Sequence, residues 1–232
     1  MKILGIIPAR GGSKGVPKKN IKLLGGKPLL QYTTEVALAS KYIDTLVVST
    51  DCNEIATVAK NLGAEVPFLR PVNLATDKAP TLPVILHALA YYQKQGIYFD
   101  AVCLLQATSP FRTVTFLDKA IEKFIKSGAD ALVSVQEVPH EYNPHWTFTV
   151  NANNGLSIAT GDKAIVTRRQ DLPKAYHRDG SIYLTKRQVL QEQQSLYGKN
   201  IAYLASPKEW YVNIDTMDDW AKAEQLVENL EL

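Results

Sequence analysis

The stretch Ile3-Leu4-Gly5-Ile6-Ile7-Pro8-Ala9-Arg10-Gly11-Gly12-Ser13-Lys14-Gly15-Val16-Pro17-Lys18-Lys19-Asn20 joins an apolar run to a basic loop with three glycines. The apolar run is short and rich in isoleucine, which is typical of a buried strand. Glycines let backbone N–H groups approach a ligand closely, and the Lys and Arg side chains supply positive charge. In an open α/β sheet, a polyphosphate binds in such a loop at the end of a strand.

Two familiar phosphate-binding motifs are absent from this region. The P-loop needs Gly-Lys followed by Ser or Thr, whereas Gly26-Lys27 precedes a proline. The Rossmann fingerprint needs Gly-x-Gly-x-x-Gly, which the spacing of Gly11, Gly12 and Gly15 does not match. A solvated basic loop is the alternative. We favour phosphate binding because five of the thirteen residues 10–22 are Lys or Arg and follow a predicted strand.

Residues 7–20 resemble the nucleotide-binding motif of the acylneuraminate cytidylyltransferases, which include CMP-sialic acid synthetases and their relatives for legionaminic and pseudaminic acids. The resemblance covers residues 6–215 and is weakest over 139–163. It implies an enzyme that transfers CMP from CTP to the anomeric hydroxyl of an acidic nine-carbon sugar, a nonulosonic acid, and releases pyrophosphate. It also implies a Mg²⁺ cofactor and a homodimer.

Composition limits the broad class of the protein. The chain has 232 residues, of which 46% are hydrophobic, and this suits a single α/β domain over residues 1–232. The net charge of +3 is modest, so we expect no nucleic-acid partner. No apolar stretch has the length of a signal peptide core or a membrane span, and two cysteines in or beside strands favour reduced thiols. We therefore expect a cytoplasmic protein.

Hydrophobic periodicity predicts alternating strands and helices. Strands or extended segments are expected at residues 3–7, 45–49, 64–69, 100–105, 129–135, 180–184, 201–204 and 210–214. Helices are expected at residues 28–40, 53–62, 82–95, 113–127, 186–194 and 216–230. The alternation implies a three-layer α/β fold with a mostly parallel sheet, a Rossmann-like nucleotidyltransferase fold.

The pattern changes between residues 139 and 168, where aromatic residues, asparagines and short alternating segments appear. Residues 146–150 and 156–158 flank 151–155, which is typical of a hairpin. A hairpin has little core of its own, so we expect this protruding arm to pack on something else, most simply a second copy of the chain. The resemblance also implies dimerisation here. A lid on the same chain is the alternative.

By resemblance, the basic loop surrounds the triphosphate of CTP. Its cations would neutralise the phosphates, including the α-phosphate, where charge grows in the transition state. The matching positions are Arg10, Ser13, Lys14, Lys19 and Asn20. We expect Arg10 and Lys19 to be catalytic, whereas Lys18 and Lys22 fit ordinary surface lysines.

A second segment resembles the part of the family that binds the pyrimidine. A guanidinium can donate to the carbonyl oxygen and ring nitrogen of cytosine, and backbone carbonyls can accept from its amino group. The resemblance assigns these contacts to Arg70, Ala79 and Thr81. Asp77 fits a turn residue as well as it fits a contact.

Two further segments resemble motifs for the acceptor sugar. In the run Leu104-Leu105-Gln106-Ala107-Thr108-Ser109-Pro110-Phe111-Arg112-Thr113, Gln106 would face the sugar or the ribose. For Arg112, we favour a salt bridge at the start of a helix over a ligand contact. Relatives acting on Kdo carry an acidic residue in this turn, so Thr108-Ser109 favours the acylneuraminate branch.

Residues 168–183 resemble the family segment Arg-Gln-x-Leu-Pro…Gly-x-Ile-Tyr, and this implies sugar contacts from Arg169, His177 and Tyr183. Arg169 suits a carboxylate or a phosphate, because a guanidinium binds either with two parallel hydrogen bonds. Tyr183 fits a core position equally well. His177 and Asp179 stand where sialic acid synthetases have Arg and Asn, which leaves the identity of the sugar open.

The run Val212-Asn213-Ile214-Asp215-Thr216 resembles the metal-binding Asp-x-Asp-Thr motif. Asp215 matches the outer aspartate and would be catalytic as a Mg²⁺ ligand. Asn213 replaces the inner aspartate and can ligate only through its amide oxygen. Alternate residues of a strand share a face, so the two should converge. The alternative for Asp215 is a helix N-cap.

Two other functions remain open. One is a catalytically silent nucleotide-binding module, which the loss of an aspartate at Asn213 would favour. The other is a nucleotidyltransferase for another acid sugar, such as a Kdo-type sugar.

Overall fold

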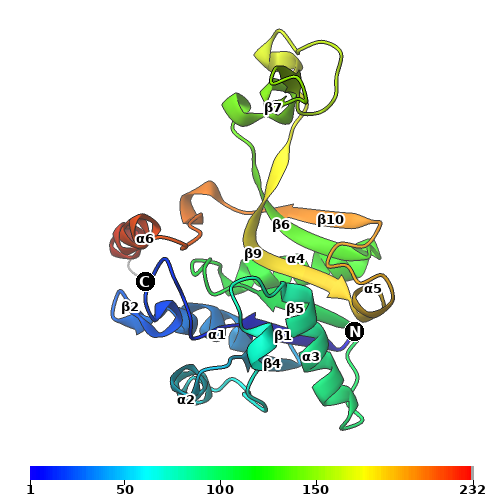
Figure 1. The fold of residues 1–232 in the computed structure, drawn as a ribbon. Helices are drawn as coiled ribbons and strands as arrows, with labels where there is room; N and C mark the ends of the chain where they lie inside the picture. The colour runs from blue at the N-terminus through cyan, green and yellow to red at the C-terminus, as the bar shows by residue number, and fades with distance from the viewer. Residues whose placement is uncertain (231–232) are drawn as a thin grey trace.

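The computed structural model describes residues 1–230, with side chains as far as residue 228, and its centre is one mixed sheet between helices (Figure 1). The strand order is β10-β6-β9-β5-β1-β4. Strand β9 is antiparallel to β5 and β6, and the other neighbouring pairs are parallel. The strands are β1 (Ile3–Pro8), β4 (Thr45–Ser49), β5 (Ala101–Leu105), β6 (Ala131–Glu137), β9 (Tyr176–Lys186) and β10 (Ile201–Ala205). The predicted mostly parallel sheet is confirmed.

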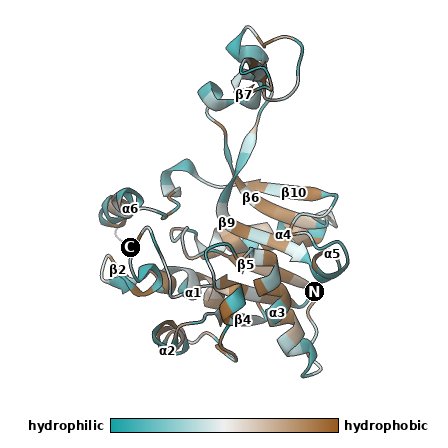
Figure 2. Cartoon of the chain, in the orientation of Figure 1, coloured by the Kyte–Doolittle hydropathy of each residue, from teal (hydrophilic) through white to brown (hydrophobic). Residues whose placement is uncertain are grey.

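The central strands are apolar on both faces because helices cover both. In β1, Ile3 and Ile7 pack into one core cluster, whereas Leu4 and Ile6 pack into the other. This two-residue alternation explains why the sequence shows a continuous apolar run. The same concentration of hydrophobic residues is visible along the sheet in Figure 2.

Helices α1 (Leu29–Ala39), α2 (Asn53–Asn61) and α4 (Val114–Ser127) contribute to the first cluster. Helices α3 (Thr81–Gln93) and α5 (Arg187–Glu192) contribute to the second cluster. The clusters therefore lie on opposite sides of the sheet, which confirms three layers. The last helix, α6 (Met217–Leu230), packs through Trp220 against α1 and the short strand β2 (Leu23–Leu24).

Several local features differ from the prediction. A two-residue hairpin of β2 and β3 (Lys27–Pro28) was not expected, and its turn residues Gly25 and Gly26 have φ of 53° and 81°. Residues 210–214 form no strand of the sheet, and Ile214 N donates to Thr108 O at 2.8 Å. Residues 64–69 are extended as predicted and form two isolated bridges to the β4 region.

Short 3-10 turns lie in the connections. They are η1 (Lys19–Ile21), η2 (Val72–Leu74), η3 (His140–Tyr142), η4 (Pro144–Trp146), η5 (Arg169–Asp171) and η6 (Lys208–Trp210). Within residues 1–230, none of the helices combines the length and the apolar composition that a membrane-spanning helix needs.

The segment between β6 and β9 forms an arm that projects away from the sheet (Figure 1). It carries the predicted hairpin, in which β7 (Phe148–Val150) pairs with β8 (Leu156–Ile158). Polar contacts hold the arm together, including Trp146 Nε1 to Val166 O at 2.5 Å. Several large apolar side chains of the arm are exposed, among them Tyr142, Phe148, Val150, Leu156 and Ile165.

Candidate active site

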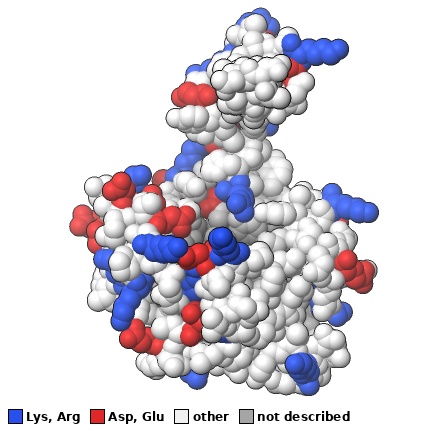
Figure 3. Space-filling model, viewed as in Figure 1, with Lys and Arg blue, Asp and Glu red and all other residues white. Residues whose placement is uncertain are grey.

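A cleft of about 430 Å³ lies at the carboxyl ends of β1 and β5. Strand β1 has β4 on one side and β5 on the other, so this is a point where the strand order reverses, and ligands bind at such points in open α/β sheets. Loops from distant parts of the sequence form the walls. They contribute Arg10, Ser13, Lys14, Gly15, Lys19, Asn20, Arg70, Thr76, Asp77, Ala79, Thr81, Gln106, Thr108 and Asp215. Basic and acidic side chains are interspersed on the face of the body below the arm (Figure 3).

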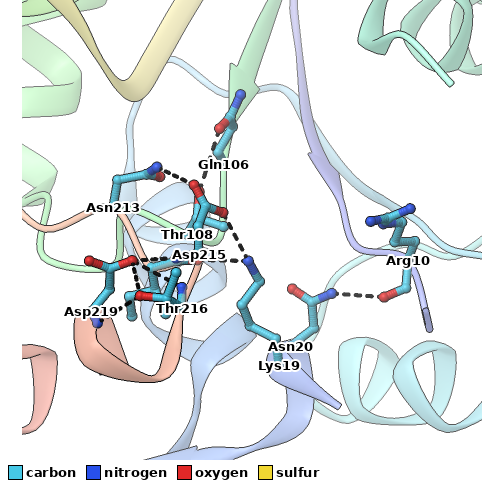
Figure 4. A network of polar contacts seen from close by, with 10 residues as sticks. Arg10, Lys19, Asn20, Gln106, Thr108, Asn213, Asp215, Thr216 and Asp219 are labelled. Carbon is cyan, nitrogen blue, oxygen red and sulfur yellow. Dashed lines mark hydrogen bonds and ion pairs between the residues drawn. The ribbon is translucent and has the colours of Figure 1, made fainter. Parts of the chain in front are cut away.

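The glycine-containing loop after β1 is fixed by hydrogen bonds at both ends. Gly11 N donates to Asp51 Oδ1 at 3.0 Å, and the buried Asn20 donates from Nδ2 to Arg10 O at 3.0 Å (Figure 4). The structure therefore brings all five predicted phosphate-binding residues to the cleft, with Asn20 holding the shape of the loop. Lys18 is exposed and pairs with Glu54, as expected for a surface lysine.

Lys19 joins this loop to the C-terminal part of the chain. Its side chain is only 13% exposed, and Nζ lies 3.2 Å from Asp215 Oδ1. Nζ also donates to Ile214 O at 2.6 Å. A cation and a carboxylate 196 positions apart in sequence thus share one wall of the cleft.

Asp215 is not the cap of α6, so that alternative is wrong. Thr216 and Asp219 form the cap between them: Asp219 Oδ2 accepts from Thr216 N at 2.9 Å, and Thr216 Oγ1 accepts from Asp219 N at 3.2 Å. The hydrogen bond from Thr216 lowers the pKa of Asp219. Asp215 instead accepts from Asn213 Nδ2 at 2.6 Å (Figure 4).

Asp215 and Asn213 offer a carboxylate and an amide to a metal ion. The Asn213 amide donates from Nδ2 to Asp215 and so orients the carboxylate that would meet the ion. Among residues 1–230, no group of three or more His, Cys, Asp and Glu could hold a metal. Mg²⁺ commonly binds through one or two carboxylates plus substrate phosphates and waters. The donor set therefore fits a Mg²⁺ ion that arrives with a triphosphate.

Arg70 lines the cleft and is only 6% exposed. Its Nε donates to Ser49 Oγ at 3.1 Å, its Nη2 donates to Ser49 O, and burial lowers its pKa. Nη1 has only a long contact of 3.5 Å with Leu74 O and so retains donor capacity. Ala79 and Thr81, the other predicted base-binding residues, also line the cleft.

Gln106 lines the cleft just after the end of β5, whereas Arg112 is buried and is not among the residues that line it. Arg112 is buried and donates to Gln106 O at 2.5 Å, Thr33 Oγ1 at 2.8 Å and Ser181 Oγ at 2.9 Å. Burial lowers its pKa to about 10. The expected salt bridge at a helix start is wrong, because none of these three partners is a carboxylate.

Asp179 is 2% exposed and faces the interior of the protein. It accepts hydrogen bonds from Ser134 Oγ at 2.5 Å, Ser206 Oγ at 2.6 Å and Ser181 N at 2.8 Å. Asp179 replaces the Asn of the sialic acid synthetases, and this substitution therefore lies in a buried hydrogen-bond network. It carries no direct information about the sugar.

The structure does not bring three of the predicted sugar-binding residues to the cleft. Tyr183 is buried in the second core cluster. His177 is exposed on β9, with its ring 5.8 Å from that of Tyr211. Arg169 lies at the base of the arm, beside a separate cavity of about 470 Å³ that Lys208 also lines.

Sequence reasoning missed two relationships in the cleft. Asp77 forms ion pairs with both Arg10 and Lys14. Gly15 lies directly against the backbone of Asp215. The length of the loop 70–81 was a signal that it is functional, but no sequence pattern indicates which cations its aspartate meets.

The sequence profile of the family described as Cytidylyltransferase matches residues 4–231. The chain belongs to the cytidylyltransferase family. It is 38% identical over 219 residues to the pseudaminic acid cytidylyltransferase of Campylobacter jejuni subsp. jejuni serotype O:23/36 (strain 81-176), a match that covers 94% of this chain and 93% of the relative. It is 37% identical over 229 residues to the CMP-N,N'-diacetyllegionaminic acid synthase of Legionella pneumophila subsp. pneumophila (strain Philadelphia 1), covering 98% and 97% of the two chains.

A solved structure of CMP:2-keto-3-deoxy-manno-octonic acid synthetase complexed with CTP has a TM-score of 0.72 to this cytidylyltransferase. The two chains are 18% identical and are both covered completely, so this similarity supports the fold alone. The resemblance seen in the basic loop is confirmed at the level of the family, and the protein is an enzyme of the nucleotidyltransferase class.

Proposed function

We propose that this enzyme transfers CMP from CTP to the anomeric hydroxyl of a nonulosonic acid of the pseudaminic, legionaminic or sialic acid type, and releases pyrophosphate. The observation that carries the proposal is the convergence of the basic loop, Arg70 and Asp215 on one cleft. The similarity to enzymes named for pseudaminic and legionaminic acids supports the choice of sugar class.

In the proposed complex, the nucleotide lies along the cleft. The cytosine is at the Arg70 end, because the free donors of Arg70 suit its carbonyl oxygen and ring nitrogen. The triphosphate lies against the loop that carries Arg10 and Lys14, where glycines leave backbone N–H groups accessible.

The anomeric hydroxyl attacks the α-phosphorus in line and loses its proton to water, and the bond from the α-phosphorus to pyrophosphate breaks. Lys19 is largely buried and held in place by Ile214 O, so it supplies a positioned positive charge for the phosphate oxygens. Positioning and charge neutralisation are the main catalytic contributions of such a site.

Asp215, assisted by Asn213, would hold the Mg²⁺ ion. The ion would supply charge neutralisation and orientation of the triphosphate. Lys19 beside the same carboxylate keeps Asp215 turned toward the cleft.

The acceptor sugar is placed beside Gln106, which lines the cleft just after β5. A Cβ atom added to Gly180 would lie 3.4 Å from Ser109 Oγ, 3.6 Å from Asn213 Oδ1 and 3.7 Å from Gln106 Oε1. Gly180, whose φ is +80°, therefore packs closely against three polar side chains, including Gln106. This arrangement suits a polyhydroxylated ligand.

We also propose that two copies pair through the arm, since exposed Tyr142, Val150 and Leu156 give it an apolar surface. Arg169 is remote from the cleft of its own chain, so a role in sugar binding requires the cleft of a second copy. We place the reaction in the cytoplasm because Cys52 and Cys103 are both free thiols.

The test is pyrophosphate release with CTP, Mg²⁺ and a panel of pseudaminic, legionaminic, sialic and Kdo-type sugars. We expect turnover with at least one nonulosonic acid, and a loss of turnover when EDTA removes the metal. CTP binding without turnover on any acid sugar would favour a silent nucleotide-binding module. Turnover on the Kdo-type sugar alone would overturn the proposed sugar class, and competition with UTP and ATP tests the choice of base.

A further inference from the structure

The carboxylate of Asp77 spans the cleft from the loop 70–81 to the basic loop after β1. Its Oδ1 lies 2.5 Å from Arg10 Nη1, and its Oδ2 pairs with Lys14 Nζ. Each oxygen thus faces one cation. Among the residues that the structure describes, neither cation has a second acidic partner.

These two cations are among those that the proposed function assigns to the phosphates of CTP. The side chains of Lys14 and Asp77 are 81% and 38% exposed, so an incoming anion can reach both partners. Hydrogen bonds from Lys14 and then from Arg10 lower the pKa of Asp77, so its carboxylate is charged at neutral pH. A phosphate group cannot approach Arg10 and Lys14 at contact distance without meeting this negative charge.

We infer that Asp77 competes with the polyphosphate for Arg10 and Lys14 and thereby promotes release of pyrophosphate. The inference rests on the proposed function of the cleft and assigns to Asp77 a role that the resemblance left open. Every ligand that uses the two cations must first break the same two ion pairs. CTP offsets this loss through its base as well as its phosphates, whereas pyrophosphate has no base to bind.

The advantage for an enzyme lies in turnover. Tight binding of a product slows release, and release limits the turnover of many enzymes. Asp77 returns the two cations to an ion-paired state once pyrophosphate leaves. It also keeps both side chains over the cleft between turnovers, in the position that the next triphosphate needs.

Calorimetry tests this with inorganic pyrophosphate in EDTA, CTP and cytidine as three separate probes. The variants are Asp77→Asn and Asp77→Ala, with Glu54→Gln as the matched control. The control makes the same change of charge next to the same loop, but Glu54 pairs with Lys18, which does not line the cleft.

Exposed ion pairs are individually weak, so the expected effect is moderate. Both Asp77 variants should bind pyrophosphate roughly threefold to tenfold more tightly than wild type, with a similar gain for CTP and none for cytidine. Pyrophosphate should become a stronger product inhibitor by the same factor. Glu54→Gln should match wild type with all three probes.

The contrary outcomes are distinct. Pyrophosphate binding that is unchanged, weakened or absent in the Asp77 variants overturns the inference. Weaker cytidine binding would show that Asp77 only braces the loop 70–81, which also overturns it. Wild-type protein that binds pyrophosphate but not CTP would refute the proposed function. The competition by Asp77 could then still be measured with pyrophosphate and the Asp77 variants.

Discussion

The carbonyl oxygen of Asp215 lies so close to Gly15 that a Cβ atom added to Gly15 would be 1.9 Å from it. This packing of backbone on backbone sets the distance between the basic loop and the segment that carries Asp215. Only glycine permits it, because a contact below 3.0 Å requires the neighbouring backbone to move. Lys19 then bridges the same two segments through Ile214 O.

We therefore predict that Gly15→Ala lowers kcat/KM for CTP by about 100-fold, since a displacement of about 1 Å at a reacting centre can have an effect of that size. Pyrophosphate release measures this, and circular dichroism checks the fold. Gly12→Ala is the matched control, because a Cβ atom there meets nothing within 4 Å. Equal losses in both variants would contradict the explanation.

Lys19→Ala and Asp215→Ala should each lose turnover while the protein stays folded. Each residue lines the cleft, and neither belongs to the three apolar core clusters. Because the two side chains form one ion pair, the double variant should lose less than the product of the two single losses. Steady-state pyrophosphate release gives all three values.

Lys18→Ala is the control for this series, since Lys18 pairs with Glu54 outside the cleft and should keep wild-type turnover. Wild-type turnover in either Lys19→Ala or Asp215→Ala would refute the role given to that residue.

The elements whose sequence signal is local were predictable. Strand β4 was predicted with its observed bounds, because a short, continuous apolar run with β-branched residues is typical of a strand buried on both faces. The hairpin of β2 and β3 was missed because two-residue strands have no periodicity. Its only signal was the Gly25-Gly26 pair.

The site was predictable where a motif and its geometry coincide, as in the basic loop and at Asp215. It was not predictable where burial decides the role. Asp179 and Arg112 are charged residues in polar segments, yet both are buried, and only tertiary packing determines this. The ion pairs of Asp77 likewise depend on how two loops meet, which no spacing within one segment encodes.

The buried Arg112 should be important for stability. Its guanidinium links α1, β9 and the residue that follows β5 through three hydrogen bonds, and it lies in the field of the buried Asp179. Removing it leaves buried polar groups without partners, so Arg112→Ala should lower the free energy of unfolding by about 1–3 kcal/mol for each group left unpaired. Urea unfolding monitored by fluorescence measures the change.

Arg168→Ala is the control for Arg112, because Arg168 is exposed and pairs with Asp171 on the surface. A surface substitution of this kind should change stability by no more than about 0.5 kcal/mol. If Arg112→Ala were as stable as this control, the buried network would have no structural role.

His87 should make the stability of the protein depend on pH. Its Nδ1 is buried and has no hydrogen-bond partner within the described part of the chain, and its ring packs edge-on against Phe68 at 4.6 Å. Burial lowers its pKa, and the charge of Arg70 lowers it further. In the unfolded chain, a histidine has a pKa of about 6.5. The unfolded state therefore takes up a proton before the folded state does as the pH falls.

Stability from neutral His87 is fully present above the unfolded pKa and is lost as the pH falls from there through the lowered folded pKa. We predict that His87→Phe, which keeps an aromatic ring against Phe68, flattens the fall in the free energy of unfolding as the pH drops below about 6.5. Urea unfolding at several pH values and constant ionic strength measures both slopes. Parallel curves for wild type and variant would show that another group titrates in this range.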